Sequence, residues 1–293
     1  MKHSSRGFEA LGYIVLGIFS ISCLLPFVML LSGSFTAEVA ITRNGYRLFP
    51  SEFGTDAWKF IVNKIPLFSG AIIRSLAVTF LGTIIHTILA STLAYPLSKP
   101  DLPGRSVLSF LVILTLLLNG GLVPTYIVYT HVFNIKNTFW ALLVPSLLMN
   151  GFNVTLMRNY YTQSIPASML EAARIDGAKE HKIFTSVVLP CSKPMLTTIS
   201  LMAALVYWND WNNGLYYITD ERKMGLQSIL NSIVQNAEFL SKNTATLTGQ
   251  TQTAPIESLR MAVALVAAIP MIIAYICLQK YFIAGITVGA VKE

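Results

Sequence analysis

Residues 171–194 read EAARIDGAKEHKIFTSVVLPCSKP, a short charged segment between two strongly apolar stretches of the chain. Good helix formers followed by one glycine predict a helix of about one and a half turns, a break at Gly177 and a second short helix. Pro190 and Pro194 predict the end of that second helix. A polar, structured loop in this setting needs a partner in the aqueous phase, so it is the first candidate for a functional site.

The composition indicates a membrane protein. The 293 residues are 54% hydrophobic and 12% charged, with a mean hydropathy of +0.59. A soluble domain carries about 25% charged residues, so this chain has too few charges to cover a soluble surface. The net charge of +7 comes from 21 basic residues that are dispersed along the chain without a nucleic-acid motif. We therefore expect lipid, and no nucleic acid, around this chain.

Six long runs lack Lys, Arg, Asp and Glu, except for Asp210 in the fifth. A helix of about 20 residues crosses a hydrocarbon core of about 30 Å, and lipid leaves the backbone only helices or closed barrels. No alternation of period two supports a barrel. The sequence therefore predicts an all-α membrane protein. Its six transmembrane helices are expected at about 10–34, 75–97, 107–130, 138–157, 195–219 and 260–279.

These spans define a transmembrane domain over residues 10–279, between an N-terminal segment 1–9 and a C-terminal tail 280–293. The first apolar run is longer than the 7–15 residues of a signal-peptide core, so we expect an uncleaved helix. An even number of spans places both termini on one side. Basic residues in the short loop between spans two and three favour the cytoplasm for that side only slightly, and the resemblance described below decides the orientation. The loop 164–192, between spans four and five, is then cytoplasmic.

The loop 164–192 contains recognisable helix signals. Pro166 suits the first helical turn, with Ser164 or Ile165 at the cap position. Gly177 suits the left-handed conformation that ends a helix, and Asp176 suits the cap of the next one. An apolar stripe on the second helix is expected from Ile183, Phe184, Val187 and Val188. By spacing alone, this pattern also fits an ordinary helix that lies on the membrane surface.

The whole pattern is more specific than its parts. E-A-A-x-x-D-G-A at 171–178, then Phe184, Leu189-Pro190 and Pro194, resembles the "EAA" coupling loop of binding-protein-dependent ABC importers. The tail 279–292 and Trp208-Asn209 look like those of carbohydrate-importer permeases of the maltose-transporter type. Within that type, the chain is most similar to the subgroup associated with complex oligosaccharides and uronate-containing glycans. The resemblance covers the whole chain.

The resemblance implies partners and a role for the loop. The partners are a second homologous permease, two ATPase subunits and an extracytoplasmic solute-binding protein, in a bacterial inner membrane. The chain has no G-x-x-x-x-G-K-[ST] phosphate loop, so it is expected to be no enzyme and to bind no cofactor, while the partner ATPases use ATP and Mg. Glu171 would supply the acidic contact, Ala172 and Ala173 close approach, and Gly177 the turn. The residues expected to couple the chain to the ATPase are Glu171, Ala172, Ala173, Asp176, Gly177 and Ala178.

The candidates for a sugar path lie inside the spans. Asp210 is the only acidic residue in a span, and an intramembrane charge, which costs about 2.5–3.5 kcal/mol on insertion scales, indicates function by default. Its aromatic and amide neighbours suit a sugar, because rings pack on C–H faces and amides bond hydroxyls. Alternatively, Asp210 is hydrated near the outer end of span five, with tryptophans at the interface. The cluster comprises Trp208, Asn209, Asp210 and Asn212.

Asn119, Asn150 and Asn153, in spans three and four, fit either the translocation path or hydrogen bonds between helices. His86 stands alone in span two, where a neutral, helix-bonded ring is the simpler interpretation than a ligand. No pair or metal-ligand spacing is visible among Cys23, Cys191 and Cys277. No metal site is expected.

Two long segments are expected outside the membrane. Residues 38–74 are expected to form a small amphipathic cap. Residues 220–260 are expected to contain an exposed loop near 242–253. The second segment looks like the family's probe for the solute-binding protein, although a merely solvated loop fits equally well.

Other functions remain as alternatives. An ABC permease for a different solute is the nearest one. A secondary transporter working alone would usually carry inverted repeats or a broken-helix pair, together with several buried ionisable residues, whereas this chain offers one Asp and one His in its spans. A membrane enzyme would need a catalytic signature, and the sequence shows none. The sequence leaves the glycan, its length and its charge open.

Overall fold

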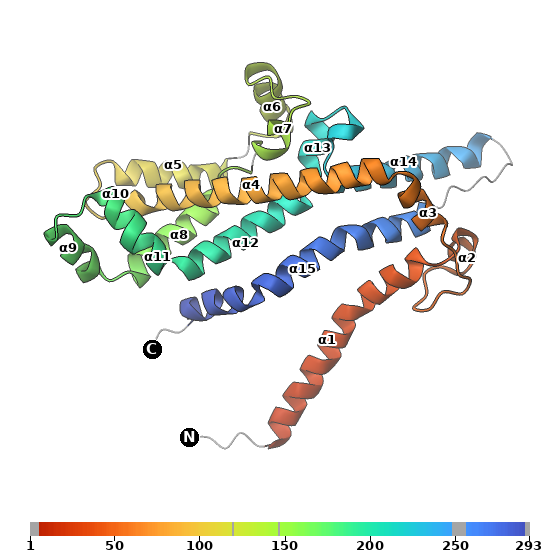
Figure 1. Cartoon of the computed structure of the whole chain (residues 1–293), viewed down its shortest axis with the longest axis horizontal. Coiled ribbons are helices and arrows are strands. Elements are labelled where there is room, and N and C mark those ends of the chain that lie inside the picture. The colour runs from red at the N-terminus through yellow and green to blue at the C-terminus, as the bar shows by residue number, and fades with distance from the viewer. Residues whose placement is uncertain (1–5, 119, 146, 248–255, 291–293) are drawn as a thin grey trace. The chain divides into compact units, whose positions relative to one another are not determined.

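The computed structural model describes residues 6–118, 120–145, 147–247 and 256–290. These residues are mostly helical, and the part described contains one isolated antiparallel bridge, between Thr36 and Phe53 (Figure 1). The contacts divide the chain into two compact units. The first comprises Met1–Phe68 with Leu230–Ile272, and the second Ser69–Ile229 with Ile273–Glu293.

The first unit contains the N-terminal half of one long helix, which a carboxylate caps. It contains α1 (Arg6–Ser34), α2 (Glu38–Asn44), α3 (Asp56–Asn63), most of α14 (Leu226–Leu247) and the first half of α15 (Ile256–Ala290). The Glu38 carboxylate accepts hydrogen bonds from the backbone N–H groups of Glu257 and Ser258 at 2.8 and 2.9 Å. An acid in this position satisfies the open N–H groups at a helix start. The segment 38–74 therefore contains helical structure that anchors α15.

The second unit contains most of α4 (Ile65–Ser98) and the elements from α5 to α13. The helices that follow α4 are α5 (Arg105–Leu117), α6 (Leu122–Ile127), α7 (Trp140–Leu143), α8 (Gly151–Ser164), α9 (Ala167–Ile175), α10 (Glu180–Ile183), α11 (Leu189–Cys191), α12 (Lys193–Asn209) and α13 (Asn212–Tyr217). Two π-helical turns, η1 (Val128–Val132) and η2 (Phe184–Val188), and the 3₁₀ turn η3 (Glu221–Lys223) complete it. Single π turns often mark functional positions.

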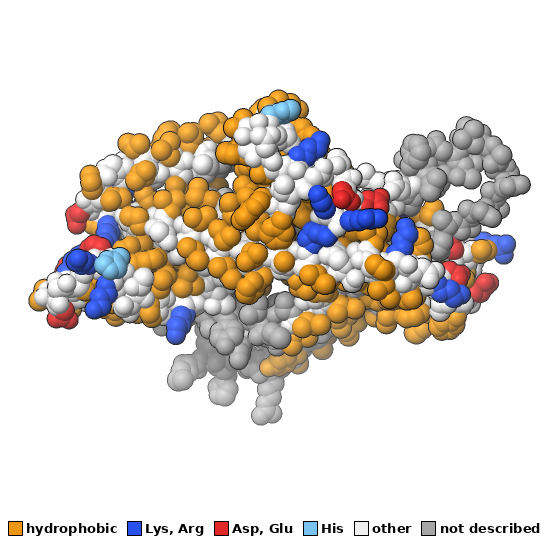
Figure 2. Space-filling model, turned by 45° about the horizontal axis from the view of Figure 1, so that its top comes forward, with side chains coloured by type: hydrophobic (Ala, Val, Ile, Leu, Met, Phe, Trp, Pro, Cys, Tyr) orange, Lys and Arg blue, Asp and Glu red, His pale blue; other side chains and the backbone are white. Residues whose placement is uncertain are grey.

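Three helices of the described residues are long and apolar enough to cross a membrane. They cover Ala10–Ser34, Ile65–Ser98 and Ile256–Ile273, and the number rises to five if each of two bent helix pairs is one span. The first, second and last predicted spans coincide with these helices. Figure 2 shows hydrophobic side chains over most of the visible face, with the charged side chains gathered in a few groups. The number of six stays a prediction.

The other three predicted spans are not continuous helices, which corrects the sequence analysis. In 107–130, α5 ends at Leu117, and Gly121 takes the left-handed φ of +81°. In 138–157, the described residues between α7 and α8, which are 144, 145 and 147–150, are not helical, and Pro145 lies near their start. In 195–219, α12 ends at Asn209 before an extended Asp210. The absence of charges predicts only how long an apolar segment is. The helix breaks in these three segments lie at Gly121, Pro145 and Asp210.

The expected exposed loop near 242–253 is also corrected where the structure describes it. Residues up to Leu247 belong to α14, and residues 248–255 lie outside the described part. Leu226, Ile229 and Leu230 follow the i, i+3, i+4 spacing of a helix face and are buried. This apolar face lies at the start of α14, before the polar tract, and the helix continues from it to Leu247.

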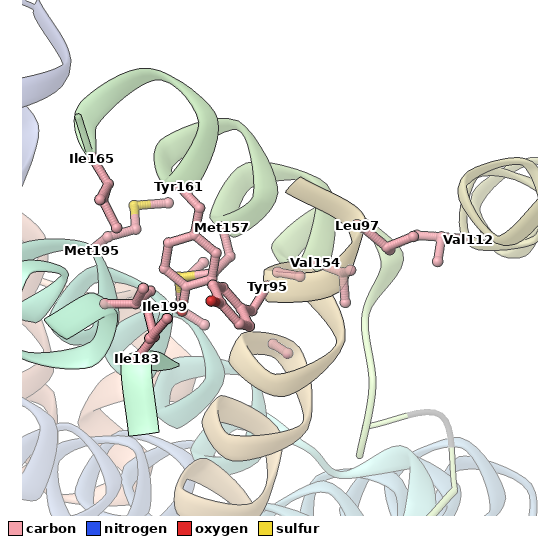
Figure 3. Packing of buried hydrophobic residues seen from close by; sticks show 13 residues of the cluster. Tyr95, Leu97, Val112, Val154, Met157, Tyr161, Ile165, Ile183, Met195 and Ile199 are labelled. Carbon is pink, nitrogen blue, oxygen red and sulfur yellow. The ribbon is translucent and has the colours of Figure 1, made fainter. Parts of the chain in front are cut away.

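A hydrophobic cluster in the second unit underlies the loop 164–192. In Figure 3, Tyr95 from α4, Met157 and Tyr161 from α8, Ile183 from α10 and Ile199 from α12 point toward one another. Met157, Ile183 and Ile199 are fully buried. The cluster comprises Ala90, Ala94, Tyr95, Leu97, Val112, Val154, Met157, Tyr161, Ile165, Ile183, Val188, Met195 and Ile199.

Candidate functional site

The first helix of the loop, α9, begins one residue later than predicted. Pro166 has an extended ψ of 132° and precedes the helix, and its carbonyl accepts the Met169 N–H at 3.1 Å. Pro166 is thus the cap rather than the first helical residue. Ile165, a predicted cap, is buried in the cluster instead.

The end of α9 is a glycine turn, as predicted. Gly177 has φ +78°. The Ala178 N–H donates to the Ala173 carbonyl at 3.0 Å, and the Gly177 N–H donates to the Arg174 carbonyl at 3.0 Å. This pair of bonds is the Schellman motif. Asp176 lies inside this turn and ends α9, while Lys179 precedes α10, so the prediction that Asp176 caps the second helix is wrong.

The loop has an inner and an outer face. Ala173 and Ala178 are half-buried and pack against the hydrophobic cluster. Glu171, Ala172, Asp176 and Gly177 are exposed. Ala173 therefore contacts the chain's own core, and its expected close approach to a partner stays a prediction. Ala172 keeps the exposure which that role requires.

Sequence reasoning missed the exposed Ile175. Its side chain is 86% exposed, a costly place for a large aliphatic group in water. Ile175 follows Glu171 by four residues, so the two side chains share one face of α9. That spacing was visible in the sequence. We define the outer face as Glu171, Ala172, Ile175 and Asp176.

The second helical segment attaches the loop to the core. Ile183 and Val188 are fully buried, and Phe184 and Val187 are half-buried, so the predicted apolar stripe is confirmed. The Phe184 ring lies 5.0 Å from the Tyr95 ring of α4, centroid to centroid. The segment then bends by 81° into α12. Pro194 stands in the first turn of α12, where its missing N–H costs nothing.

Glu180, which sequence reasoning also missed, joins three elements. Its carboxylate accepts hydrogen bonds from the Tyr95 hydroxyl at 2.8 Å, from the Lys99 ammonium, and from Arg174 Nε at 3.1 Å. Tyr95 belongs to α4, Lys99 follows it directly, and Arg174 belongs to α9. The Lys99 bond, with those from Tyr95 and Arg174, lowers the pKa of Glu180 to about 2. We call Glu180, Tyr95, Lys99 and Arg174 the carboxylate clamp.

The asparagines expected in spans three and four have different environments. Asn119 lies outside the described residues. Asn150 is exposed and caps α8, because its Oδ1 accepts the Phe152 N–H at 2.8 Å. Asn153 is buried, and its Nδ2 donates to Nε2 of His86 at 2.8 Å. Asn153 and His86 thus bond two helices, which is one of the two interpretations of Asn153 and the simpler interpretation of His86.

The residues expected around Asp210 differ in their exposure. Trp208 is buried, with 2% exposure, whereas Asn209 and Asn212 are exposed. Asp210 Oδ1 accepts the N–H groups of Asn212 and Asn213 at 3.2 and 3.4 Å. A carboxylate in that position caps α13. Asp210 therefore has a structural role at the helix break after Asn209.

The comparisons with known proteins identify the family. The family model described as "Binding-protein-dependent transport system inner membrane component" matches residues 8–288. The polygalacturonan/rhamnogalacturonan transport system permease protein YtcP of Bacillus subtilis is 35% identical over 98% of this chain and 99% of its own length. The protein LplC of the same organism is 33% identical over 99% of this chain and 96% of its own.

A solved structure is similar over the same extent. The crystal structure of a bacterial ABC transporter involved in the import of the acidic polysaccharide alginate contains a chain with a TM-score of 0.78 and 30% identity. The match covers 96% of this chain and all of that one. The chain belongs to the family of inner membrane components of binding-protein-dependent transport systems, the permease subunits of ABC importers, which have no ATPase site of their own.

Proposed function

We propose that this chain is the permease subunit of an ATP-driven importer that moves an oligosaccharide across the membrane after an extracytoplasmic solute-binding protein delivers it. The observation that carries the proposal is the loop 164–192. Its outer face exposes a carboxylate and a large aliphatic side chain, while its inner face is fixed to the core. The names of the relatives, which include polygalacturonan and alginate systems, support the oligosaccharide.

The assembly is proposed to contain a second permease and two ATPase subunits, which bind ATP and Mg. Both termini and the loop 164–192 would then lie in the cytoplasm. The outer face is the proposed docking surface for one ATPase. Burial of Ile175 against the partner would be favourable, because it removes an apolar side chain from water. The Glu171 carboxylate would form an ion pair with a basic group of the partner.

The carboxylate clamp explains how a movement of the ATPase would reach the spans. A displaced α9 pulls on Glu180 through Arg174, and Glu180 is bonded to the end of α4 through Tyr95 and Lys99. The Phe184 ring adds an apolar contact to Tyr95. Coupling requires that the loop contacts differ in free energy between the inward- and outward-facing states.

Among the candidate residues, the exposed asparagines are the ones that we propose to contact the sugar. Asn150, Asn209 and Asn212 expose their side chains, and amides suit hydroxyl groups. Trp208 and Asn153 are buried, so they are proposed to support the fold of the path rather than touch the sugar.

A charge reversal tests the proposal. Glu171→Lys should abolish oligosaccharide uptake and the co-purification of the ATPase while membrane insertion stays intact. Gln163→Lys, which also places a lysine at an exposed position, here in α8, is the control and should transport normally. Wild-type uptake by the Glu171→Lys complex would remove the coupling assignment.

A further inference from the structure

The described residues between α7 and α8, residues 144, 145 and 147–150, interrupt the fourth predicted span, and we call them the stretch 144–150. Carbonyls that leave a helix inside a membrane protein need other donors, because lipid offers none. Three alternate carbonyls, at positions 143, 145 and 147, each accept a side-chain donor. Tyr207 Oη donates to Leu143 at 3.1 Å, Asn213 Nδ2 to Pro145 at 3.1 Å, and His86 Nδ1 to Leu147 at 3.0 Å.

The three donors come from three different helices and are all buried. His86 belongs to α4, Tyr207 to α12 and Asn213 to α13, and their exposures are 3%, 4% and 7%. At Leu147 the acceptor is a carbonyl, so His86 Nδ1 carries the proton. Its Nε2 then accepts from Asn153, which fixes the ring as neutral.

Close packing holds the donors in place. A Cβ at Gly82 would lie 2.4 Å from Cζ of the Tyr207 ring, so α4 needs glycine where that ring crosses it. A Cβ at Gly214 would lie 1.9 Å from the Ser228 hydroxyl oxygen, so the helix that carries Asn213 also needs its glycine. The absence of a side chain at Gly82 and Gly214 therefore allows Tyr207 and Asn213 to approach the stretch 144–150.

We infer that His86, Tyr207 and Asn213 are positioning residues that hold the stretch 144–150 in its non-helical form, and that this form is required for passage of the sugar. The inference rests on the proposed function. The stretch ends at the exposed Asn150, whose side chain caps α8, so its shape sets where a candidate sugar-binding amide stands. Because three helices hold one stretch, a relative shift of any of them changes its backbone.

The test uses the assembled complex with its partner permease and ATPases in lipid nanodiscs and proteoliposomes. Tyr207→Phe removes one hydroxyl and leaves the ring against Gly82. We expect uptake to fall about tenfold, the effect of one unpaired buried acceptor, with assembly and basal ATP hydrolysis unchanged. Amide hydrogen exchange in 144–150 should become faster.

Thr87→Val is the matched control. It removes the hydrogen bond of 3.0 Å between Thr87 and Ser200, which also joins α4 to α12 but does not touch the stretch. Uptake by this variant should match the wild type. His86→Leu should lose uptake and His86→Gln should regain most of it, since a glutamine amide donates to Leu147 and accepts from Asn153.

The outcomes distinguish a failure of this inference from a failure of the proposed function. Normal uptake and exchange in Tyr207→Phe would overturn the inference, as would equal losses in Thr87→Val and Tyr207→Phe. If His86→Leu fails to assemble, Tyr207→Phe still decides. A wild-type complex that assembles but moves no oligosaccharide would overturn the proposed function instead.

Discussion

Glu180 shows how one residue outside the family pattern can organise the loop. It is the first residue of α10, and an acid at a helix start was visible in the sequence. Its three donors were not predictable, because two of them lie about 80 positions away in the chain, at Tyr95 and Lys99. Sequence gives the residue type, and only the fold brings the donors to it.

The first prediction concerns the charge of Glu180. Because the pKa falls from 4.5 to about 2 on folding, its contribution is fully present above about pH 4.5 and is lost as pH falls toward 2. Glu180→Gln should lower the unfolding midpoint of the purified chain by an equal amount at pH 8 and pH 5. The loss is modest, under about 1 kcal/mol, because the carboxylate is half-exposed. A difference that vanishes by pH 5 would contradict the clamp.

The second prediction concerns Gly177. At its φ of +78°, Gly177→Ala should destabilise the loop by about 1–2 kcal/mol through backbone strain alone, since a Cβ there meets open space. Gly177→Asn should cost less, because asparagine tolerates this conformation. Denaturant unfolding of the purified variants measures the order. Equal stability of the alanine variant and the wild type would show that the turn is not strained.

At the scale of elements, the sequence predicted the loop's helix–glycine–helix order and its apolar stripe. It did not predict that Ala173 faces inward and Ile175 outward, because a helix of nine residues with few charges has no clear polar side. It also missed the breaks in spans three to five. Hydropathy windows measure the length of an apolar run. They do not detect the helix breaks at Pro145 and Asp210.

The third prediction concerns the contact between η2 and α4. Phe184→Ala removes the ring that lies 5.0 Å from Tyr95, and should cost up to about 3 kcal/mol, the lower bound for a fully buried phenylalanine. The loop would then move without α4, so ATP hydrolysis should continue while uptake falls. Phe184→Leu, which keeps most of the apolar volume, is the control. Coupled transport in Phe184→Ala would exclude this contact from the coupling route.

At the scale of the whole molecule, the apolar helix α1 needs an apolar environment that the chain itself does not supply. The most apolar 18-residue window of its span Ala10–Ser34 buries none of its residues within the chain, so lipid or another subunit must cover it. The family membership and the proposed docking surface of α9 point to an assembly.

The fourth prediction follows for that assembly. The tagged chain, extracted in mild detergent from its native membrane, should co-purify with an ATPase and a second permease, identified by mass spectrometry. Recovery of the chain alone, or only with copies of itself, would reopen the secondary-transporter alternative.

The central claim is that the outer face of α9 meets the ATPase while its inner face does not. A photo-crosslinking residue, p-benzoylphenylalanine, placed at Ile175 or at Ala173 in the assembled complex tests it most directly. The account predicts an adduct with the ATPase from position 175, which is 86% exposed, and an adduct within the chain from position 173, which packs on the cluster. An ATPase adduct from position 173 alone, or from neither position, would contradict it.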